Sequence, residues 1–306
     1  MKRDYIVLLK PEKKLTTIST PATKSKGKFK AKGKSLTTKG TKQPATMPMR
    51  VERLESKKAA EVESRNDVDR VVPAMPMKLM KPFKVNTPAK PTAQNNTWGV
   101  EATLAHTSGF DGTGIKVAVL DTGINKSHPA FKGVKFTLKD FSGEGVADQD
   151  GHGTHCAGTV FGRNVNGTRI GIAPGVKEVL IGKVIGNDGG SSTSIASAIN
   201  WALENEANVI SLSLGIDFPG FVTELTGEGM DSDIATSKAL EGYRANVLLF
   251  EKLAAFVASL GMFNSASILI AAAGNESRRE AGEDFEIATD ADVVPVTADP
   301  VGDNAG

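Results

Sequence analysis

Cysteine is nearly absent from this chain of 306 residues, in which Cys156 is the only one. A single thiol excludes an intramolecular disulfide and leaves the redox compartment open. Long apolar runs are also missing, and none approaches the roughly 20 residues that a membrane-spanning helix needs. The run Ile6–Leu9 is too short for the apolar core of a secretory signal. The sequence therefore predicts no membrane span. With no signal peptide visible it favours a cytoplasmic location, although the compartment itself stays unknown.

Charge is present in both signs but is unevenly distributed along the chain. Residues 1–58 contain 17 lysines and arginines against 4 aspartates and glutamates, and residues 59–306 contain 20 against 31. The first part therefore carries a net charge of +13 and the rest −11. Such a basic arm is typical of a solvated tail, of a segment that docks on the acidic body, or of contact with nucleic acid or anionic lipid. Only Tyr5 and Phe29 place aromatic rings in the arm, which disfavours nucleic-acid binding.

Short elements and polar linkers alternate in the first 96 residues. A strand is predicted at Tyr5–Leu9, and Lys10–Thr46 is predicted to be a disordered linker because it is rich in Lys, Thr, Gly and Pro. Val51–Val62 has helical character, and Asp69–Pro73 has the pattern of a strand with a proline-rich exit. Pro73–Asn96 holds five prolines and no apolar period, which predicts a tether to the next domain.

From Gly114 onward, strand and helix patterns alternate. Continuous apolar runs predict strands at residues 115–120, 179–184, 209–214 and 268–273, and stripes with a period near 3.6 predict helices at 194–204 and 234–260. This succession predicts an α/β fold with a largely parallel sheet, helices on both faces and right-handed crossovers. The glycine and acidic content of Phe218–Met230 predicts a surface loop.

The apolar strand Val117–Leu120 ends on Asp121-Thr122-Gly123. In a parallel α/β sheet, functional groups lie at the carboxyl ends of strands, where the loops form a crevice. Asp121 occupies that position, so it is a candidate for the carboxylate that orients a catalytic base. The tripeptide alone also fits a turn-capping aspartate, an aspartic protease or a phosphatase.

A second candidate is His152, which lies 31 residues after Asp121 and between two glycines at a predicted helix start. An imidazole in this setting allows close approach of another chain and suits a general base. His155 follows at a spacing that differs from the i, i+4 pair of zinc-binding helices, so no metal site is predicted. Cys156 shares a helix face with His152. A Cys–His nucleophile is conceivable there, but a small buried residue is favoured.

Three segments together resemble the subtilisin-like serine proteases, or subtilases: residues 117–123, 150–158 and 271–277. The resemblance implies that Asp121 orients the base, that His152 is the base, and that the Asn275 amide donates to the oxyanion of the tetrahedral intermediate. Because it maps the base onto His152, the resemblance also implies a structural role for His155. Members of this family are often secreted, in contrast to the location that the sequence favours. Calcium is the only cofactor that the resemblance makes possible.

The resemblance also implies a peptide-binding groove with two edges. Ser213, Leu214 and Gly215 resemble one edge, and Gly189 and Gly190 resemble the other. A substrate polypeptide between such edges forms an additional β-strand that is held mainly by main-chain hydrogen bonds. The implied partner is therefore a polypeptide.

The same resemblance divides the chain into three parts. Residues 1–84 are expected to form a small, basic, propeptide-like α+β segment with its linker, residues 85–97 a proline-rich tether, and residues 98–306 the catalytic domain. A propeptide of this kind would be a second polypeptide partner. The opposite charges of the two parts favour docking between them.

One element of the family pattern is missing. The nucleophile segment Gly-Thr-Ser-Met-Ala occurs nowhere in the 306 residues, and Gly302–Gly306 has the character of a loop. The expectation is a serine endopeptidase of the subtilisin family, C-terminally incomplete, whose serine is not present here and which is inactive alone. The alternative is a subtilase-like protein that binds polypeptides without cleaving them.

Overall fold

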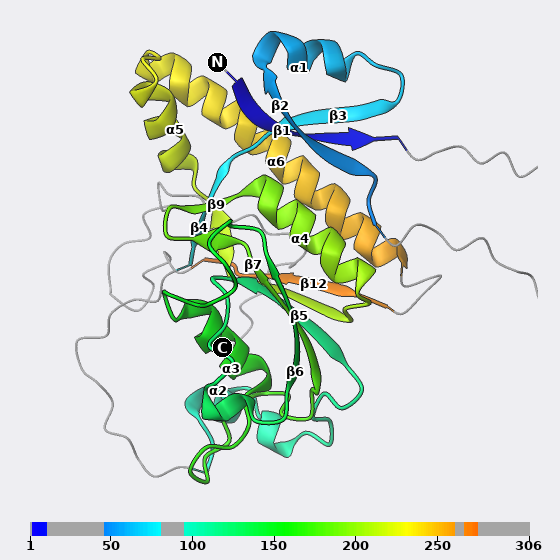
Figure 1. Ribbon diagram of the computed structural model, residues 1–306, viewed down its shortest axis with the longest axis vertical. Helices are drawn as coiled ribbons and strands as arrows, with labels where there is room; N and C mark the ends of the chain where they lie inside the picture. Colours follow the sequence, from blue (N-terminus) through cyan, green and yellow to red (C-terminus); the bar gives the residue numbers. More distant parts are fainter. Residues whose placement is uncertain (1, 11–45, 81–94, 261–265, 275–306) are drawn as a thin grey trace, which may run out of the picture.

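The structure, a computed structural model, describes residues 2–10, 46–80, 95–260 and 266–274. Its elements run along the chain as shown in Figure 1. In order they are β1 (Lys2–Leu9), β2 (Met49–Glu55), α1 (Ser56–Glu63), β3 (Val68–Pro73), β4 (Pro76–Leu79), α2 (Trp98–Ala102), η1 (Ala105–Thr107), β5 (Lys116–Asp121), η2 (Pro129–Phe131), β6 (Lys135–Asp140), α3 (His152–Phe161), β7 (Glu178–Lys183), β8 (Ile185–Gly186), β9 (Gly189–Ser191), α4 (Ser192–Glu204), β10 (Val209–Leu212), β11 (Leu214–Ile216), α5 (Phe218–Gly227), α6 (Ser232–Leu260) and β12 (Ile268–Ala271).

The central sheet has five strands in the order β12-β10-β5-β7-β6, and every neighbouring pair is parallel. Strand β5 lies in the middle and alternates between two cores, as a strand buried on both faces does. Val117 and Val119 join the cluster that contains Ala157 of α3, whereas Ala118 and Leu120 join the cluster formed with α4 and α6. Figure 1 shows α3 on one side of this sheet and α4 and α6 on the other. The predicted α/β fold with helices on both faces is confirmed.

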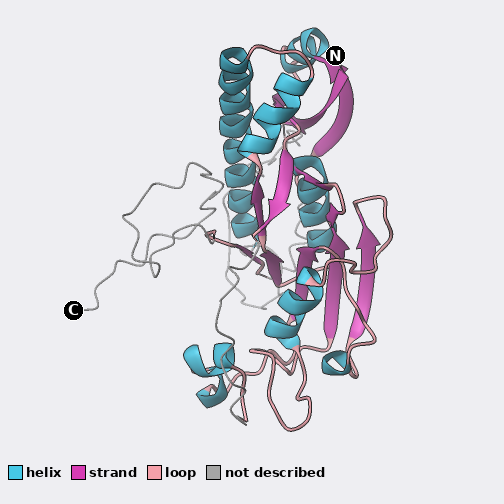
Figure 2. Cartoon of the chain, turned by 90° about the vertical axis from the view of Figure 1, so that its left-hand side faces the viewer, coloured by secondary structure: helices cyan, strands magenta, loops and turns pink. Residues whose placement is uncertain are grey.

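A second sheet is built from the start of the chain, in the order β2-β1-β3 with antiparallel pairing. One face of it packs under α1, where Val7, Val62 and Val68 are buried together. Its other face places Ile6 and Val72 in the same core cluster as α4 and α6. In Figure 2 the strands next to the N-terminus lie at one end of the molecule beside the long helix α6. The N-terminal segment is therefore packed against the body through a shared apolar core.

The third sheet, in the order β11-β4-β9-β8, contains a strand from the predicted tether. Strand β4 falls inside the predicted tether, and it pairs antiparallel with β11 on one side and β9 on the other. Pro76 stands at the first position of β4, where a missing N–H is tolerated. The prediction of a plain tether over Pro73–Asn96 was wrong for this part, and residues 81–94 lie outside the described residues.

Three further predictions need correction. The helical character assigned to Val51–Val62 belongs only to α1, because residues 49–55 pair with β1 as strand β2. The expected strand 209–214 divides at Ser213 into β10 and β11, which belong to different sheets. The expected surface loop Phe218–Met230 is largely helix α5, with Phe221 and Leu225 buried. The helix has its local signals, since the Asp217 side chain accepts from the Gly220 N–H and Pro219 lies in its first turn.

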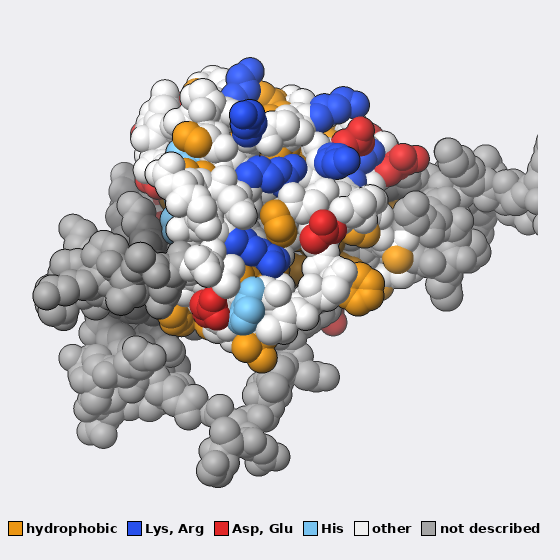
Figure 3. Space-filling view, turned by 90° about the horizontal axis from the view of Figure 1, so that it is seen from below, with side chains coloured by type: hydrophobic (Ala, Val, Ile, Leu, Met, Phe, Trp, Pro, Cys, Tyr) orange, Lys and Arg blue, Asp and Glu red, His pale blue; other side chains and the backbone are white. Residues whose placement is uncertain are grey.

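Among the described residues, no helix combines the length and the hydropathy needed to cross a membrane. Figure 3 shows the molecule from below, where apolar side chains lie in small separate groups among polar atoms and basic side chains. Scattered apolar groups of this size are normal for a folded surface. Residues 11–45, on which the predicted linker falls, are outside the described residues.

Candidate active site

Asp121 is fully buried at the carboxyl end of β5. Its Oδ1 accepts the Thr122 backbone N–H at 2.8 Å and lies 2.7 Å from Nδ1 of His152. Its Oδ2 has no hydrogen-bond partner among the described residues. A buried carboxylate is stabilised only when it is paired and hydrogen-bonded. The pair with His152 supplies that compensation and fixes which ring nitrogen faces the carboxylate.

His152 is the first residue of α3, and the close packing of two glycine segments brings it to Asp121. A Cβ atom on Gly153 would lie 2.4 Å from the Gly123 carbonyl oxygen, so only glycine allows this approach. The Gly153 N–H donates to Thr122 Oγ1 at 2.8 Å, which ties the helix start to the end of β5. The two predicted residues, separated by 31 positions, therefore meet as the sequence analysis expected.

The surroundings of His152 stabilise its protonated form. The hydrogen bond to Asp121, followed by the contact with Cys156, raises the pKa of His152 from 6.5 to about 10, while partial burial acts in the opposite direction. With Nδ1 directed at the carboxylate, the second ring nitrogen, Nε2, is left to exchange a proton with another group. This is the arrangement of an imidazole that an acid group orients for general-base chemistry.

Asp148 organises the loop that precedes His152, a role that the sequence analysis missed. Its carboxylate accepts from Thr122 Oγ1 and the Gly151 N–H, each at 2.8 Å, and from the Thr154 N–H at 2.8 Å. Burial alone would raise the pKa of Asp148, but these hydrogen bonds outweigh it and hold the pKa below its usual value. Because a charged acceptor stabilises three donors at once, the loop is fixed next to the Asp121–His152 pair.

Cys156 and His155 follow His152 on α3. The Cys156 side chain is partly buried and packs against the cluster that contains Ala157 and Phe161, and its Sγ lies 3.7 Å from His152 Nδ1. His155 is exposed, and its structural role stays a prediction. Among the described residues, Asp121, His152 and Cys156 form the only group of three ligand-type side chains that lie close together. Nitrogen and sulfur donors do not fit calcium, which takes six to eight oxygen ligands.

Next to this pair lie the two segments that the resemblance implies as edges of a peptide-binding groove, and strand β4 runs between them. On one edge, Leu214 pairs with Leu79 and Gly215 pairs with Lys78, and Ser213 accepts the Met80 N–H at 3.3 Å. The other edge consists of Gly189 and Gly190, and Gly190 pairs with Met77. A Cβ atom on Gly190 would lie 2.6 Å from the Val184 carbonyl oxygen, so the edge requires glycine.

The two edges are occupied by strand β4 of the same chain. Strand β4 lies between β11 and β9 as a third, antiparallel strand. Met77 in this strand is almost fully buried within the core cluster that contains Leu214 and Ile216. The geometry is that of an extended polypeptide bound by β-strand addition. Sequence reasoning could not find it, because the pairing partners are more than 110 residues apart along the chain.

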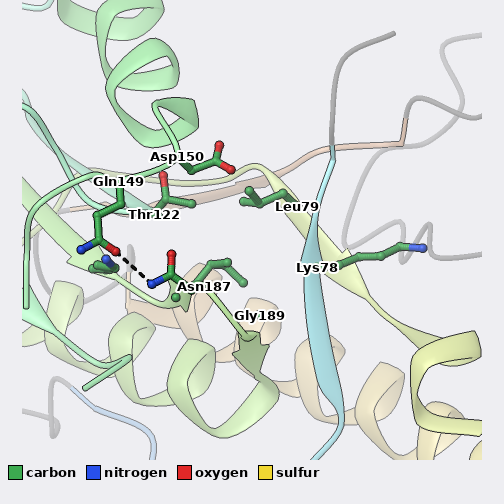
Figure 4. Close-up of a pocket in the computed structure, with 10 residues that line it drawn as sticks. Lys78, Leu79, Thr122, Gln149, Asp150, Asn187 and Gly189 are labelled. Carbon is green, nitrogen blue, oxygen red and sulfur yellow. Dashed lines mark hydrogen bonds between the residues drawn. The ribbon is translucent and has the colours of Figure 1, made fainter. Parts of the chain in front are cut away.

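A cavity of about 570 Å³ opens where β4, β5 and the loop before α3 meet. Figure 4 shows Leu79 projecting from β4 toward Asp150 and Thr122, and Lys78 pointing away. The lining residues are Lys78, Leu79, Thr122, Gln149, Asp150, Lys183, Ile185, Gly186, Asn187 and Gly189. Most of its polar side chains were not singled out from the sequence. Asn275, the expected oxyanion donor, lies outside the described residues.

Comparisons with known proteins agree with this geometry. The family model of the subtilase family matches residues 112–298, which is more than half of the chain. The chain belongs to the subtilase family.

Among curated relatives, Subtilisin BL from Lederbergia lenta is 42% identical over 139 residues, which are 43% of this chain and 50% of that protein. The Major intracellular serine protease of Bacillus subtilis (strain 168) is 44% identical over 115 residues, or 35% of this chain and 36% of that protein. The alkaline protease of Alkalihalobacillus alcalophilus is 42% identical over 139 residues, or 43% of this chain and 35% of that protein. The chain thus spans half or less of the length of these relatives.

Proposed function

We propose that these residues belong to a serine endopeptidase in which Asp121 orients His152 and His152 acts as the general base. The observation that carries the proposal is the 2.7 Å contact between His152 Nδ1 and Asp121 at the end of a groove that holds an extended peptide. Family membership and the names of the relatives support it. Since the chain covers only part of those relatives, the activity is a proposal for the whole protein.

The proposed reaction is acyl transfer to a serine. His152 Nε2 takes the proton from the serine hydroxyl as its oxygen attacks the peptide carbonyl, and it then gives that proton to the leaving amine. Asp121 stays ionised and stabilises the imidazolium that forms between the two steps. The pKa of His152, raised to about 10, favours the imidazolium that forms during the reaction, and the neutral base predominates only on the alkaline side of that raised pKa. We propose Asn275 as a donor to the oxyanion.

The serine is not among these 306 residues, because no Gly-Thr-Ser-Met-Ala segment occurs in them. Without a nucleophile, the pair could act only on water, with a loss of many orders of magnitude in rate. We therefore expect the 306-residue chain to be inactive by itself. The activity requires a polypeptide that supplies this segment together with the residues described here.

We further propose that residues 2–80 act as a propeptide that inhibits the groove. Strand β4 pairs with both groove edges, so a substrate cannot bind there until β4 leaves. The strand is continuous with the N-terminal sheet, which packs on α6 through the shared core. The division into propeptide, tether and catalytic domain remains part of this proposal. Calcium is not assigned a site, since the described donors do not fit it.

The test compares two proteins. The 306-residue chain is expected to resist a fluorophosphonate serine probe, and a fusion that adds a C-terminal segment with Gly-Thr-Ser-Met-Ala is expected to react and to hydrolyse peptides. In the fusion, His152→Ala should lower kcat by about four to six orders of magnitude, the scale seen when a subtilisin triad is broken. The Asp121→Asn change should cost about 10⁴-fold. Hydrolysis that survives His152→Ala would contradict the proposal.

A non-catalytic role is the second candidate. The groove is filled by an extended strand, and this fact alone also fits a protein that binds polypeptides without cleaving them. The two candidates differ in what the Asp121–His152 pair does. If a folded fusion with the nucleophile segment binds peptides but neither reacts with the probe nor cleaves them, the binding role is favoured.

A further inference from the structure

The cavity beside β4 lies against one side chain of the bound strand. Leu79, the last residue of β4, lines it, and Met80 directly follows and donates its N–H to the Ser213 carbonyl at the groove edge. Figure 4 shows the Leu79 side chain directed toward Asp150. The cavity has a volume of about 570 Å³, far more than a leucine side chain fills. A longer side chain at this position would therefore extend into the space between Asp150, Gln149 and Asn187.

The polar groups around the cavity differ in whether they are already paired. The side chain of Lys183 is almost fully buried, and its Nζ donates to the Ala147 carbonyl at 3.0 Å and lies 3.7 Å from the Glu144 carboxylate. Glu144 also accepts the Asn187 N–H at 2.9 Å. The Asn187 amide donates to Gln149 Oε1 at 3.1 Å. These groups compensate one another and add little net charge to the cavity.

Asp150 is the exception among the groups that line the cavity. Its Oδ1 accepts only a long hydrogen bond, 3.3 Å, from the His152 N–H, and the residue is exposed at the cavity wall. Asp148, two positions earlier, is directed inward, where its oxygens bind Thr122, Gly151 and Thr154. Asp150 thus presents a carboxylate to any group that enters from the direction of Leu79.

We propose that this cavity selects polypeptides with lysine or arginine at the position of Leu79, and that Asp150 is the residue that determines the preference. An arginine there would lay its alkyl part over Ile185 and bring its guanidinium to the Asp150 carboxylate, a pairing that is geometrically favoured. The chain's own Leu79 fills the position without using this contact, which suits a segment that must leave. This inference rests on the proposed function, because it names the class of substrate that the same groove would bind.

The experiment reads the occupancy of the groove and needs no catalysis. Amide hydrogen exchange of residues 77–80 is measured in the full chain with Leu79→Arg and with Leu79→Gln, whose side chain is long and polar but uncharged. Each is also made with Asp150→Asn, which keeps the acceptor for the His152 N–H. Exchange of strand β1 and the unfolding transition are recorded for every variant, so that loss of the fold is distinguished from loss of β4.

The expected result is that Leu79→Arg protects residues 77–80 more strongly than Leu79→Gln, by roughly two- to five-fold, the range of a partly exposed ion pair. The advantage should disappear with Asp150→Asn and decrease with added salt. Equal protection of the arginine and glutamine variants, an advantage that persists with Asp150→Asn, or release of β4 by both polar residues would overturn the inference. None of these outcomes depends on whether the protein cleaves peptides, so a failure here is separable from a failure of the proposed activity.

Discussion

The N-terminal segment meets the body in two places that differ in kind. In the groove, β4 is held mainly through main-chain pairing with β11 and β9, with one side chain, Met77, buried in the core. At the other contact, the sheet β2-β1-β3 is held through buried side chains, with Ile6, Leu8 and Val72 inside the core that includes α4 and α6. Main-chain pairing accepts many sequences, whereas side-chain packing accepts few. The groove is therefore suited to exchange of peptides, and the sheet contact to recognition of this one segment.

Polar contacts add to the buried side chains where the N-terminal segment packs on α5 and α6, and they involve side chains of that particular segment. Arg3 pairs with Glu224 of α5 and with Glu228, which directly follows that helix, and its guanidinium lies 5.2 Å from the centre of the Phe221 ring. The Asn246 side chain of α6 donates to the Pro73 carbonyl at 2.9 Å. Helices α5 and α6, which the sequence places between the groove edge and β12, thus supply much of the surface that holds the segment.

The largest expected effect concerns the apolar side of this comparison. Ile6→Ala should lower the free energy of unfolding by about 2–5 kcal/mol, because Ile6 is fully buried and its removal leaves a cavity in the shared core. Val51→Ala, on an exposed position of the same sheet, is the matched control and should change little. Urea denaturation measures both. Similar values for the two variants would mean that the sheet is not packed on the body.

The Asp121–His152 pair beside the groove is charged, so its contribution to the free energy of unfolding changes with pH in a defined direction. The pKa of His152 is raised from 6.5 to about 10, so protonation stabilises the folded state. This contribution is fully present below pH 6.5 and is lost as the pH rises through about 10. The Asp121→Asn change removes the carboxylate that is the largest cause of the raised His152 pKa. The stability difference between the two proteins should therefore be greatest in acid and shrink toward pH 10, and a difference that is constant with pH would be evidence against the pair.

The smallest expected effect is at the ion pairs of Arg3. Its side chain is mostly buried, but Glu224 is about half exposed, so solvent screens the interaction. Arg3→Gln should cost roughly 0.2–1 kcal/mol for each pair and should matter less at high salt. Thermal unfolding at two salt concentrations is the measurement. Arg50→Gln, which removes a pair within the N-terminal segment, is the control. A salt-independent loss several times larger would show that Arg3 acts mainly through packing.

The sequence was sufficient for features that short segments determine. Asp121 follows its own strand and His152 begins its own helix, so residue types at fixed offsets predict where each lies. The parallel order of strands follows from helices between them. The position of β4 between β11 and β9 could not be predicted, because these strands are far from it along the chain. The prolines in this segment also favoured a tether over a strand. Helix α5 was missed for another reason: its cap at Asp217 was present but was outweighed by glycine and acidic content.

Self-cleavage tests the central claim most directly, because it asks whether β4 lies where a substrate lies. In a fusion of these residues with a segment that carries Gly-Thr-Ser-Met-Ala, the N-terminal sequence and the mass of the products are determined. The account predicts cleavage directly after Met80, whose N–H donates to the Ser213 carbonyl at the groove edge, and its loss with His152→Ala. A folded fusion that hydrolyses added peptides but leaves the bond between Met80 and Lys81 uncut, or is cut elsewhere, would contradict the claim that β4 occupies the substrate position.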